Sequence, residues 1–319
     1  MLYVLVGISL VRWFPYRWWR LTHKLLGVPF AFACWHFYTA EKTYANNSGW
    51  GWYSGLIMVA GLTAFVLRVV VRDAVTRGTP HRVTSAAVTG STMELELAPT
   101  KHAVEYEAGQ FAVVKVQKRG LSEPHIFTIA STPDETGLRF YIRDLGDWTA
   151  RLHRSELVGT RVLIEGPYGR FEPFTHGRTP TVWIAGGVGI TPFLAAAGGL
   201  DKAPKEQRPW LFLCVRDTVD ATGLDAMRQA EADGRINLVM CSSAEGNRFG
   251  VDTLKRKFRE NGLRSAHVAL CGPASLLAAA ELAARALGAH QVEREDFDIR
   301  QGFGPDLSRQ IDALFSSRT

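Results

Sequence analysis

The strongest constraint on the fold of this chain is the contrast between its first 72 residues and the remainder. Residues 1–72 hold only eight charged side chains, whereas 21% of all 319 residues are charged. Within this part, residues 52–71 form an apolar run about as long as the ~20 residues that cross a bilayer as a helix. Residues 18–40 form a second such run. We therefore expect an α-helical transmembrane hairpin in residues 1–72, followed by soluble domains.

A third apolar stretch, residues 1–11, is too short to span a bilayer. A secretory signal peptide would also explain it, but no small-residue cleavage site follows. We interpret it as the end of a helix whose beginning is missing from this chain.

Basic side chains flank the two long runs on one side. They precede the first run and follow the second, whereas the loop at residues 40–51 holds only Glu41 and Lys42; the flanking residues are Arg12, Arg17, Arg20, Arg68, Arg72 and Arg77. The positive-inside rule then predicts a multi-pass protein of the plasma or inner membrane with its soluble domains in the cytoplasm. A buried hairpin in a soluble protein is the alternative.

Two histidines, His23 and His36, lie in the run at 18–40. Polar groups inside a membrane are functional candidates, although packing is the bland alternative. Their spacing corresponds to ~20 Å along a helix, which would suit two haem groups stacked across a membrane. On a straight helix the rings would point about 220° apart, unless Pro29 kinks it. Every other histidine follows residue 80, so this chain alone cannot complete a bis-histidine haem site.

Short alternating stretches replace the apolar runs from about residue 80. Gly, Pro and Asp separate them, a pattern typical of strands in a small antiparallel β-barrel. The barrel is expected over residues 73–175, with strands at 83–90, 93–99, 109–117, 125–131, 138–144 and 161–167.

Two stretches of this barrel carry possible binding residues. Alternation along 125–131 points His125 and Phe127 to one face and Ile126 and Thr128 to the other. Residues 145–152 begin a helix whose backbone amides and Thr149 hydroxyl could hold a pyrophosphate, with charge added by Arg143; the helix start also contains Gly146, Asp147 and Trp148. A capped amphipathic helix is the alternative.

Strands and helices alternate from residue 179 onward. Apolar strands at 181–187, 210–217, 236–243 and 267–273 are separated by helices at 191–200, 222–233 and 251–261, and a further helix follows at 274–287. This order predicts an α/β doubly wound parallel sheet over residues 176–319, with ligands beyond the carboxyl ends of the strands. Thr191 would cap the first helix and Pro192 would occupy its first position.

The turn after the first of these strands is rich in glycine. Gly186, Gly187 and Gly189 leave room for a diphosphate near the backbone, although close strand–helix packing also favours glycine. Arg216 ends the next strand, where a guanidinium could bind a 2′-phosphate, so we favour NADPH over NADH. Arg248 is a second candidate for this role, and ordinary surface charge is the alternative.

Composition argues against other classes of function. The net charge of +6 is spread along the chain without a basic, aromatic-rich run, which argues against nucleic-acid binding. The four cysteines show no CxxC spacing, so the sequence indicates neither a disulfide framework nor a metal knuckle. This fits a soluble part in a reducing cytosol.

The motifs GQF, HxFTxxS, IRxLGDWT and GPYG occur in this order in the first soluble domain. Together they resemble the FAD domain of the ferric reductase and NADPH oxidase superfamily, and the wider ferredoxin–NADP reductase fold. The resemblance implies that His125 and Thr128 contact the FAD ribityl or phosphate groups and that Phe127 lies beside the flavin. It also implies that the pyrophosphate is held by Arg143, Gly146, Trp148 and Thr149. Ser131 and Asp147 belong to the same motifs, and Ile126 replaces a proline that is frequent in the family.

In the second soluble domain the family has a Cys-Gly-Pro at a later strand end, matched here by Cys271, Gly272 and Pro273. The resemblance implies that this motif and the glycine turn line the NADPH site, with Cys271 beside the nicotinamide; a structural cysteine is the alternative. Residues 295–300 resemble the closing ExFxxR segment, so either Phe297 or Phe303 is the aromatic near the flavin. Residues 18–27 resemble the fifth transmembrane helix of the family.

The favoured hypothesis is hydride transfer from NADPH to FAD, then single electrons to haem b near His23 and His36 and to a ferric chelate or oxygen outside. A second hypothesis is a haem-free, membrane-anchored reductase that serves a partner redox protein. A third is a non-catalytic subunit. The missing transmembrane helices could also lie upstream or on another chain.

Overall fold

The structure, a computed structural model, describes residues 22–41, 48–71, 78–174, 179–218, 221–246, 249–261, 263, 265–289 and 291–296. The chain separates into two compact units, Met1–Arg77 and Gly78–Thr319.

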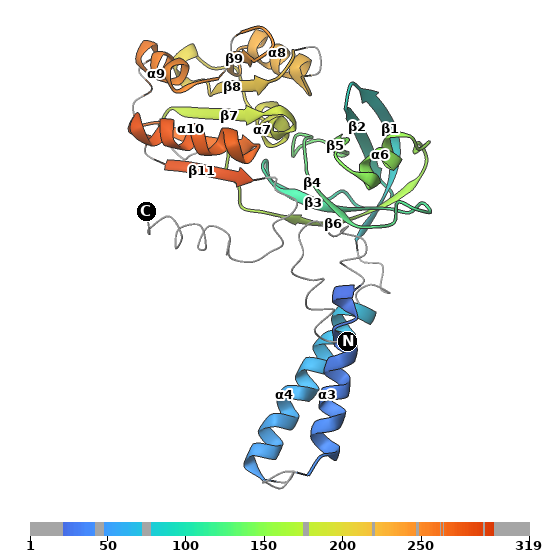
Figure 1. The fold of residues 1–319 in the computed structure, drawn as a ribbon. Coiled ribbons are helices and arrows are strands. Elements are labelled where there is room, and N and C mark those ends of the chain that lie inside the picture. The colour runs from blue at the N-terminus through green and yellow to red at the C-terminus, as the bar shows by residue number, and fades with distance from the viewer. Residues whose placement is uncertain are drawn as a thin grey trace. The chain divides into compact units, whose positions relative to one another are not determined.

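The first unit contains a pair of helices, α3 (Gly27–Thr39) and α4 (Gly49–Phe65), and a π-helical segment η1 (Val66–Val71) continues α4 (Figure 1). Glycines let the two helices approach. A β-carbon on Gly27 would overlap the ring of Phe65, and one on Gly61 would lie 2.9 Å from the ring of Phe30. Aromatic rings therefore occupy the notches that the glycines leave.

Among the residues that the structure describes, no helix has both the length and the apolar character needed to cross a membrane.

The predicted run at 18–40 is interrupted in the structure. Residues 22–24 are helical, residues 25 and 26 form a turn, and α3 begins at Gly27. Pro29 explains the break, because it has no amide hydrogen to donate to the carbonyl of Leu25. That carbonyl instead accepts a bond from the Val28 amide at 3.0 Å. His23 and His36 therefore lie in different helical segments.

The second unit begins with six antiparallel strands, and all six were predicted. They pair in the order β4-β3-β6-β1-β2-β5, and the sheet folds as a half-barrel. Just beyond β4, the Ala130 amide donates to the carbonyl of Arg139 in β5 at 2.8 Å, which joins the two edges. The helix α6 (Asp147–His153) follows β5. The strands are β1 (Thr79–Thr89), β2 (Thr92–Pro99), β3 (Phe111–Val116), β4 (His125–Thr128), β5 (Leu138–Arg143) and β6 (Arg161–Tyr168).

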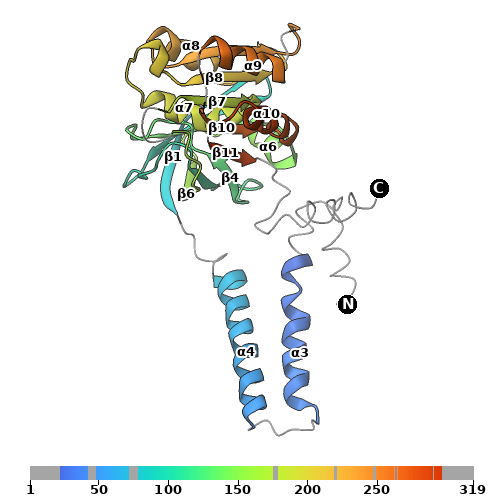
Figure 2. The same ribbon diagram turned by 90° about the vertical axis from the view of Figure 1, so that its left-hand side faces the viewer.

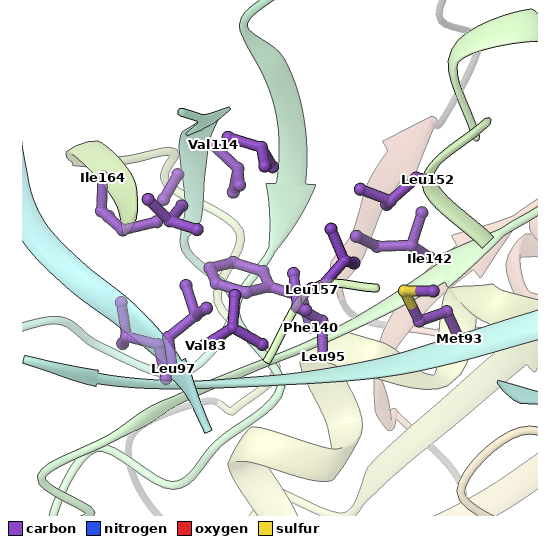
Figure 3. Packing of buried hydrophobic residues seen from close by; sticks show 14 of the residues in the cluster. Val83, Met93, Leu95, Leu97, Val114, Phe140, Ile142, Leu152, Leu157 and Ile164 are labelled. Carbon is purple, nitrogen blue, oxygen red and sulfur yellow. The ribbon is translucent and has the colours of Figure 1, made fainter. Parts of the chain in front are cut away.

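Strict alternation builds the core of this half-barrel (Figure 3). On β2, Met93, Leu95 and Leu97 are buried, whereas the glutamates between them point outward. Phe140 on β5 is fully buried against them. Apolar burial on one face of the sheet is the main stabilising contribution here.

The remaining strands form a five-stranded parallel sheet in the order β11-β10-β7-β8-β9. Helices cover both faces, with α7 and α8 on one and α9 and α10 on the other; the elements can be followed in Figures 1 and 2. This is the predicted doubly wound arrangement. Short 3₁₀ turns η2 (Gly187–Ile190) and η3 (Lys205–Gln207) lie between β7 and β8. The elements are β7 (Thr181–Gly186), α7 (Thr191–Gly198), β8 (Trp210–Val215), α8 (Leu224–Ala232), β9 (Asn237–Ser242), α9 (Val251–Glu260), β10 (His267–Gly272), α10 (Ala274–Ala286) and β11 (Gln291–Asp296).

The structure departs from the predicted nucleotide domain in two places. The edge strand β11 was not predicted, because its sequence QVERED has almost no apolar residues to alternate. The start of α7 is shifted by one residue: Ile190 is the N-cap and Thr191 is the first helical residue. The preceding 3₁₀ turn runs directly into α7, so the Thr191 hydroxyl bonds back to the carbonyl of Val188 at 3.1 Å instead of capping the helix.

Candidate functional site

The parallel sheet has a topological switch point between β7 and β10. From β7 the chain proceeds to β8 and β9 on one side, then returns to β10 on the other side of β7. Loops that leave neighbouring strands in opposite directions open a crevice at the carboxyl ends of those strands. Gly186 ends β7 and Gly272 ends β10, so the two predicted nucleotide motifs meet at this point.

Three of the glycines here allow close packing of the backbone. A β-carbon on Gly186 would lie 2.6 Å from Cδ of Pro273, and one on Gly272 would lie 2.9 Å from the amide nitrogen of Gly186. A β-carbon on Gly189 would collide with the carbonyl of Cys271. The close approach of neighbouring backbone and side-chain atoms therefore accounts for glycine at positions 186, 189 and 272.

Gly187 differs from these three. Its φ of 56° lies in the left-handed region, which disfavours side chains. The nearest atom that a β-carbon there would meet is Nη1 of Arg143, at 3.8 Å. Arg143 ends β5 of the half-barrel, so its guanidinium reaches the glycine turn of the parallel sheet. The two motifs thus face one another within a single compact unit.

Aromatic rings line one face of β4. The ring centroids of His125 and Trp148 lie 3.9 Å apart, and those of Phe127 and Trp148 lie 6.0 Å apart. Phe127 packs against the half-barrel core. On the opposite face of the strand, Ile126 is exposed and Thr128 is buried. The predicted alternation of this strand is therefore confirmed.

Two buried hydroxyls near β4 differ in their surroundings. Ser131 accepts a hydrogen bond from the Tyr106 hydroxyl at 2.8 Å and another from the Arg139 amide at 3.1 Å. The hydroxyl of Thr128 has no hydrogen-bond partner among the described residues. Because an unpaired buried hydroxyl is costly, it is a site where a ligand atom would supply the missing bond.

The start of α6 is held by Thr149. Its hydroxyl accepts from the amides of Gly146 at 2.9 Å and Leu145 at 3.0 Å. These contacts match the capped-helix alternative for Thr149. Trp148 is buried and donates its indole N–H to the carbonyl of Leu121 at 3.2 Å, so it is part of the core. Asp147 is exposed.

Cys271 is fully buried near the end of β10. Its sulfur lies 3.9 Å from Oε2 of Glu295, the residue paired with it on β11. Burial raises the pKa of Glu295 to about 7, although the bond from Cys271 opposes this. Residues 295–300 were predicted to supply an aromatic side chain, whereas no role was predicted for Glu295, the first residue of that motif.

Arg216 follows β8 with an exposed side chain. Its carbonyl accepts from the Ala244 amide at 2.9 Å and from the Ser242 hydroxyl at 3.3 Å, which fixes the backbone there. Pro192 is buried in α7, and Pro273 is the N-cap of α10. Phe297, Phe303 and Arg248 lie outside the described residues.

The two histidines of the first unit have exposed side chains. Among the residues described by the structure, no group of three or more His, Cys, Asp or Glu side chains is arranged to hold a metal ion.

Two family models match the second unit. Residues 80–172 match an FAD-binding domain, and residues 183–281 match an oxidoreductase NAD-binding domain. The first covers the half-barrel, and the second covers β7 through most of α10.

Curated relatives share parts of this region. The chain is 35% identical to dual oxidase 2 of Rattus norvegicus over 97 residues, which are 28% of this chain and 6% of that protein. It is 28% identical to NADPH oxidase 1 of Mus musculus over 135 residues (39% and 23%). It is 27% identical to the chloroplastic ferric reduction oxidase 7 of Arabidopsis thaliana over 164 residues (46% and 22%). The matched segments thus span less than a quarter of these relatives.

Solved structures share the fold. A cytochrome P450 reductase of Amycolatopsis, GcoB, aligns with a TM-score of 0.60 at 22% identity, over 70% of this chain and 71% of that one. The FAD/NAD-binding domain of a nitric oxide dioxygenase from Vibrio cholerae aligns with a TM-score of 0.57 at 18% identity, over 69% and 98%. At these identities the likeness establishes the architecture alone.

Proposed function

We propose that this chain is the electron-input part of a membrane enzyme. The premise is that it carries the FAD-binding and NAD-binding domains of an NAD(P)H-dependent oxidoreductase, homologous to dual oxidases, NADPH oxidases and ferric reduction oxidases. In this function, NADPH gives a hydride to FAD, and electrons then leave toward an acceptor at the membrane. The observation that carries the proposal is the approach of Arg143 to Gly187. It lets two dinucleotides meet at one junction.

The half-barrel residues fit FAD. The Arg143 guanidinium can pair with a pyrophosphate, and the buried Thr128 hydroxyl can bond to a ligand atom on the outer face of β4. The exposed Ile126 lies on that same face and offers apolar contact. When bound, FAD accepts a hydride and releases electrons one at a time. The protein has to orient the two rings and keep water from between them.

The switch point fits the nicotinamide nucleotide. Gly187 leaves the turn open for a diphosphate, and Arg216 offers a guanidinium to a 2′-phosphate. Cys271 and Glu295 pair side by side on β10 and β11, near the carboxyl edge of the sheet. A carboxyl group with a pKa of about 7 can hold or release a proton near neutral pH at this edge.

The helix pair fits an apolar environment. Trp35, Trp52 and Leu56 are each more than 70% exposed on α3 and α4, and large apolar side chains exposed together mark a surface that lipid or further helices cover. We propose that a bilayer and further transmembrane helices cover it, with the second unit in the cytoplasm and the chain in a plasma or inner membrane.

Haem does not fit this chain by itself. His23 and His36 offer one ligand each, and the first unit contains no other histidine. A bis-histidine haem b would require further histidines from other helices, because residues 1–77 supply only these two. If no helices supply those histidines, the second candidate is favoured: a haem-free, membrane-anchored reductase that serves a partner redox protein.

The test uses the full chain in detergent. We expect purified protein to be yellow and its flavin absorbance to bleach when NADPH is added without oxygen. Arg143→Ala should lose flavin and slow the bleaching, whereas Arg161→Ala, an exposed arginine at the start of β6, should not. An Arg143→Ala protein with full flavin content and an unchanged rate would overturn the proposal.

Haem is tested separately by absorbance, with the chain alone and after co-expression with histidine-bearing apolar helices. A haem spectrum in the second sample supports electron transfer through haem. Its absence in both samples supports the reductase that serves a partner protein.

A further inference from the structure

Cys214 and Cys241 are 27 positions apart in the sequence but adjacent in the parallel sheet. They are paired residues on neighbouring strands, Cys214 near the end of β8 and Cys241 near the end of β9. Both face the side of the sheet that α9 and α10 cover. Side chains paired in this way point in the same direction. The two thiols therefore form a pair next to the nucleotide side of the domain.

We propose that Cys214 and Cys241 form a reversible disulfide on reaction with a hydroperoxide, and that this bond weakens binding of the nicotinamide nucleotide.

Backbone spacing allows the bond. Neighbouring strands lie about 4.8 Å apart, and disulfides join residues whose Cα atoms are roughly 4.4–6.8 Å apart. Both cysteines are free in this structure. Cys241 is buried, whereas Cys214 is partly exposed, so a small oxidant can reach the pair from the side of Cys214.

The two thiols differ in their readiness to ionise. A hydrogen bond between them lowers the pKa of Cys241 and raises the pKa of Cys214, and burial adds to the rise at Cys214. Because thiolates are the nucleophiles, this difference favours Cys241 as the sulfur that attacks first. Cys214 then acts as the resolving thiol.

The chemistry balances with one hydroperoxide. The Cys241 thiolate attacks one peroxide oxygen, the O–O bond breaks, and an alcohol, or water from hydrogen peroxide, leaves with a proton. The sulfenic acid on Cys241 is then attacked by the Cys214 sulfur. The S–O bond breaks, the S–S bond forms, and water leaves with the Cys214 proton. Two thiols lose two electrons to the peroxide, and a thiol reductant returns them.

The backbone connects the two cysteines to Arg216. The effect on nucleotide binding rests on the proposed function, in which Arg216 binds the 2′-phosphate. Arg216 lies two residues after Cys214, and its carbonyl accepts bonds from the Ala244 amide and the Ser242 hydroxyl next to Cys241. An S–S bond of about 2.05 Å draws the two sulfurs closer than a hydrogen bond does. The strand ends then shift together, and the guanidinium of Arg216 moves with them.

The experiment uses reduced full-length chain in detergent, treated with one equivalent of hydrogen peroxide. Peptide mapping by mass without reductant should show peptides of Cys214 and Cys241 joined, with Cys271 unmodified. The KM for NADPH should rise about tenfold, the scale of one weakened charged contact, and dithiothreitol should restore it. The proposed disulfide would be overturned if Cys214 or Cys241 gained oxygen atoms without the two peptides becoming joined, or if Cys271 alone were modified.

Variants separate the pair from other thiols. Cys214→Ser and Cys241→Ser should make the KM insensitive to peroxide, whereas Cys34→Ser, which changes a buried cysteine of α3, should leave the response intact. If the two sheet variants do not fold, the wild-type peptide map decides whether the disulfide forms. A joined pair with an unchanged KM would overturn the regulatory part, whereas failure of the proposed function would show as no flavin bleaching by NADPH even in reduced protein.

Discussion

The sulfur of Cys271 lies 3.9 Å from Oε2 of Glu295, where β10 and β11 run side by side toward the carboxyl edge of the parallel sheet. Cys271 is fully buried, and Glu295 is only partly exposed. Burial disfavours the ionised carboxylate and raises the pKa of Glu295 from 4.5 to about 7. This carboxyl group therefore keeps its proton well above the usual range of a glutamate and releases it around neutral pH, next to a fully buried thiol.

This pair predicts how stability varies with pH. Between pH 4.5 and about 7 the unfolded chain loses the Glu295 proton while the folded chain keeps it. The free energy of unfolding therefore falls as pH rises through this window, by about 3 kcal/mol in total from this group. Glu295→Gln removes the titration, so its advantage over wild type should be small near pH 5 and largest near pH 8.

Urea unfolding of both proteins at the two pH values measures the difference, with Glu293→Gln on the same strand as the control. A Glu295→Gln effect that is equal at both values would contradict the burial of this carboxyl group.

The glycines at the switch point predict two different kinds of damage. Gly189→Ala puts a β-carbon into the carbonyl of Cys271, and the backbone cannot move aside cheaply. We expect a clear drop in the melting temperature of this variant. Gly187→Ala meets no backbone, and its left-handed φ costs roughly 1–2 kcal/mol. It should fold but bind NADPH more weakly, because the methyl group occupies the open turn.

Melting curves and the KM for NADPH together test this contrast. The predicted contrast is wrong if Gly187→Ala has a melting temperature as low as that of Gly189→Ala, or if the KM of Gly187→Ala for NADPH equals that of wild type.

Much of the fold could be predicted from alternation and apolar runs. Met93, Leu95 and Leu97 on β2 show why: one buried face leaves a period of two in the sequence. The strand β11 left no such signal because it is a polar edge strand. The sequence did point to Pro29 as a place where the helix could kink, and the break before α3 lies ahead of Pro29 because the lost amide bond affects the carbonyl four residues earlier.

The site was harder to read than the fold. A glycine that leaves room for a ligand phosphate and a glycine that lets a neighbouring strand pack closely have the same sequence signature. The same role was therefore predicted for Gly186, Gly187 and Gly189. Their difference depends on β10, which lies about 80 residues further on. The pairing of Cys214 with Cys241 was invisible for the same reason, because strand order, rather than sequence spacing, sets it.

Removing the Thr149 hydroxyl should lower both the stability of the α6 start and the amount of FAD that the protein retains. This hydroxyl accepts from the amides of Leu145 and Gly146, so Thr149→Ala leaves both without that partner and should cost about 1 kcal/mol. The loosened start of α6 should also reduce FAD retention. Thr149→Ser keeps the hydroxyl and should preserve both properties. Flavin absorbance per protein and urea unfolding measure the two effects, and undiminished flavin in Thr149→Ala would contradict the role of this helix start.

Arg216 predicts the preference between the two nicotinamide nucleotides. NADPH differs from NADH by the 2′-phosphate, and an exposed guanidinium at the end of β8 can pair with it. Arg216→Ala should therefore raise the KM for NADPH by about ten- to a hundredfold, the scale of one hydrogen-bonded charged contact, and leave the KM for NADH nearly unchanged. Arg216→Lys keeps the charge but loses the bidentate geometry, so its KM should fall between the two. Flavin reduction rates at graded nucleotide concentrations supply both constants. An equal rise for NADPH and NADH would mean that Arg216 supports the fold of the strand end, through the carbonyl that Ala244 and Ser242 bind, and does not read the phosphate.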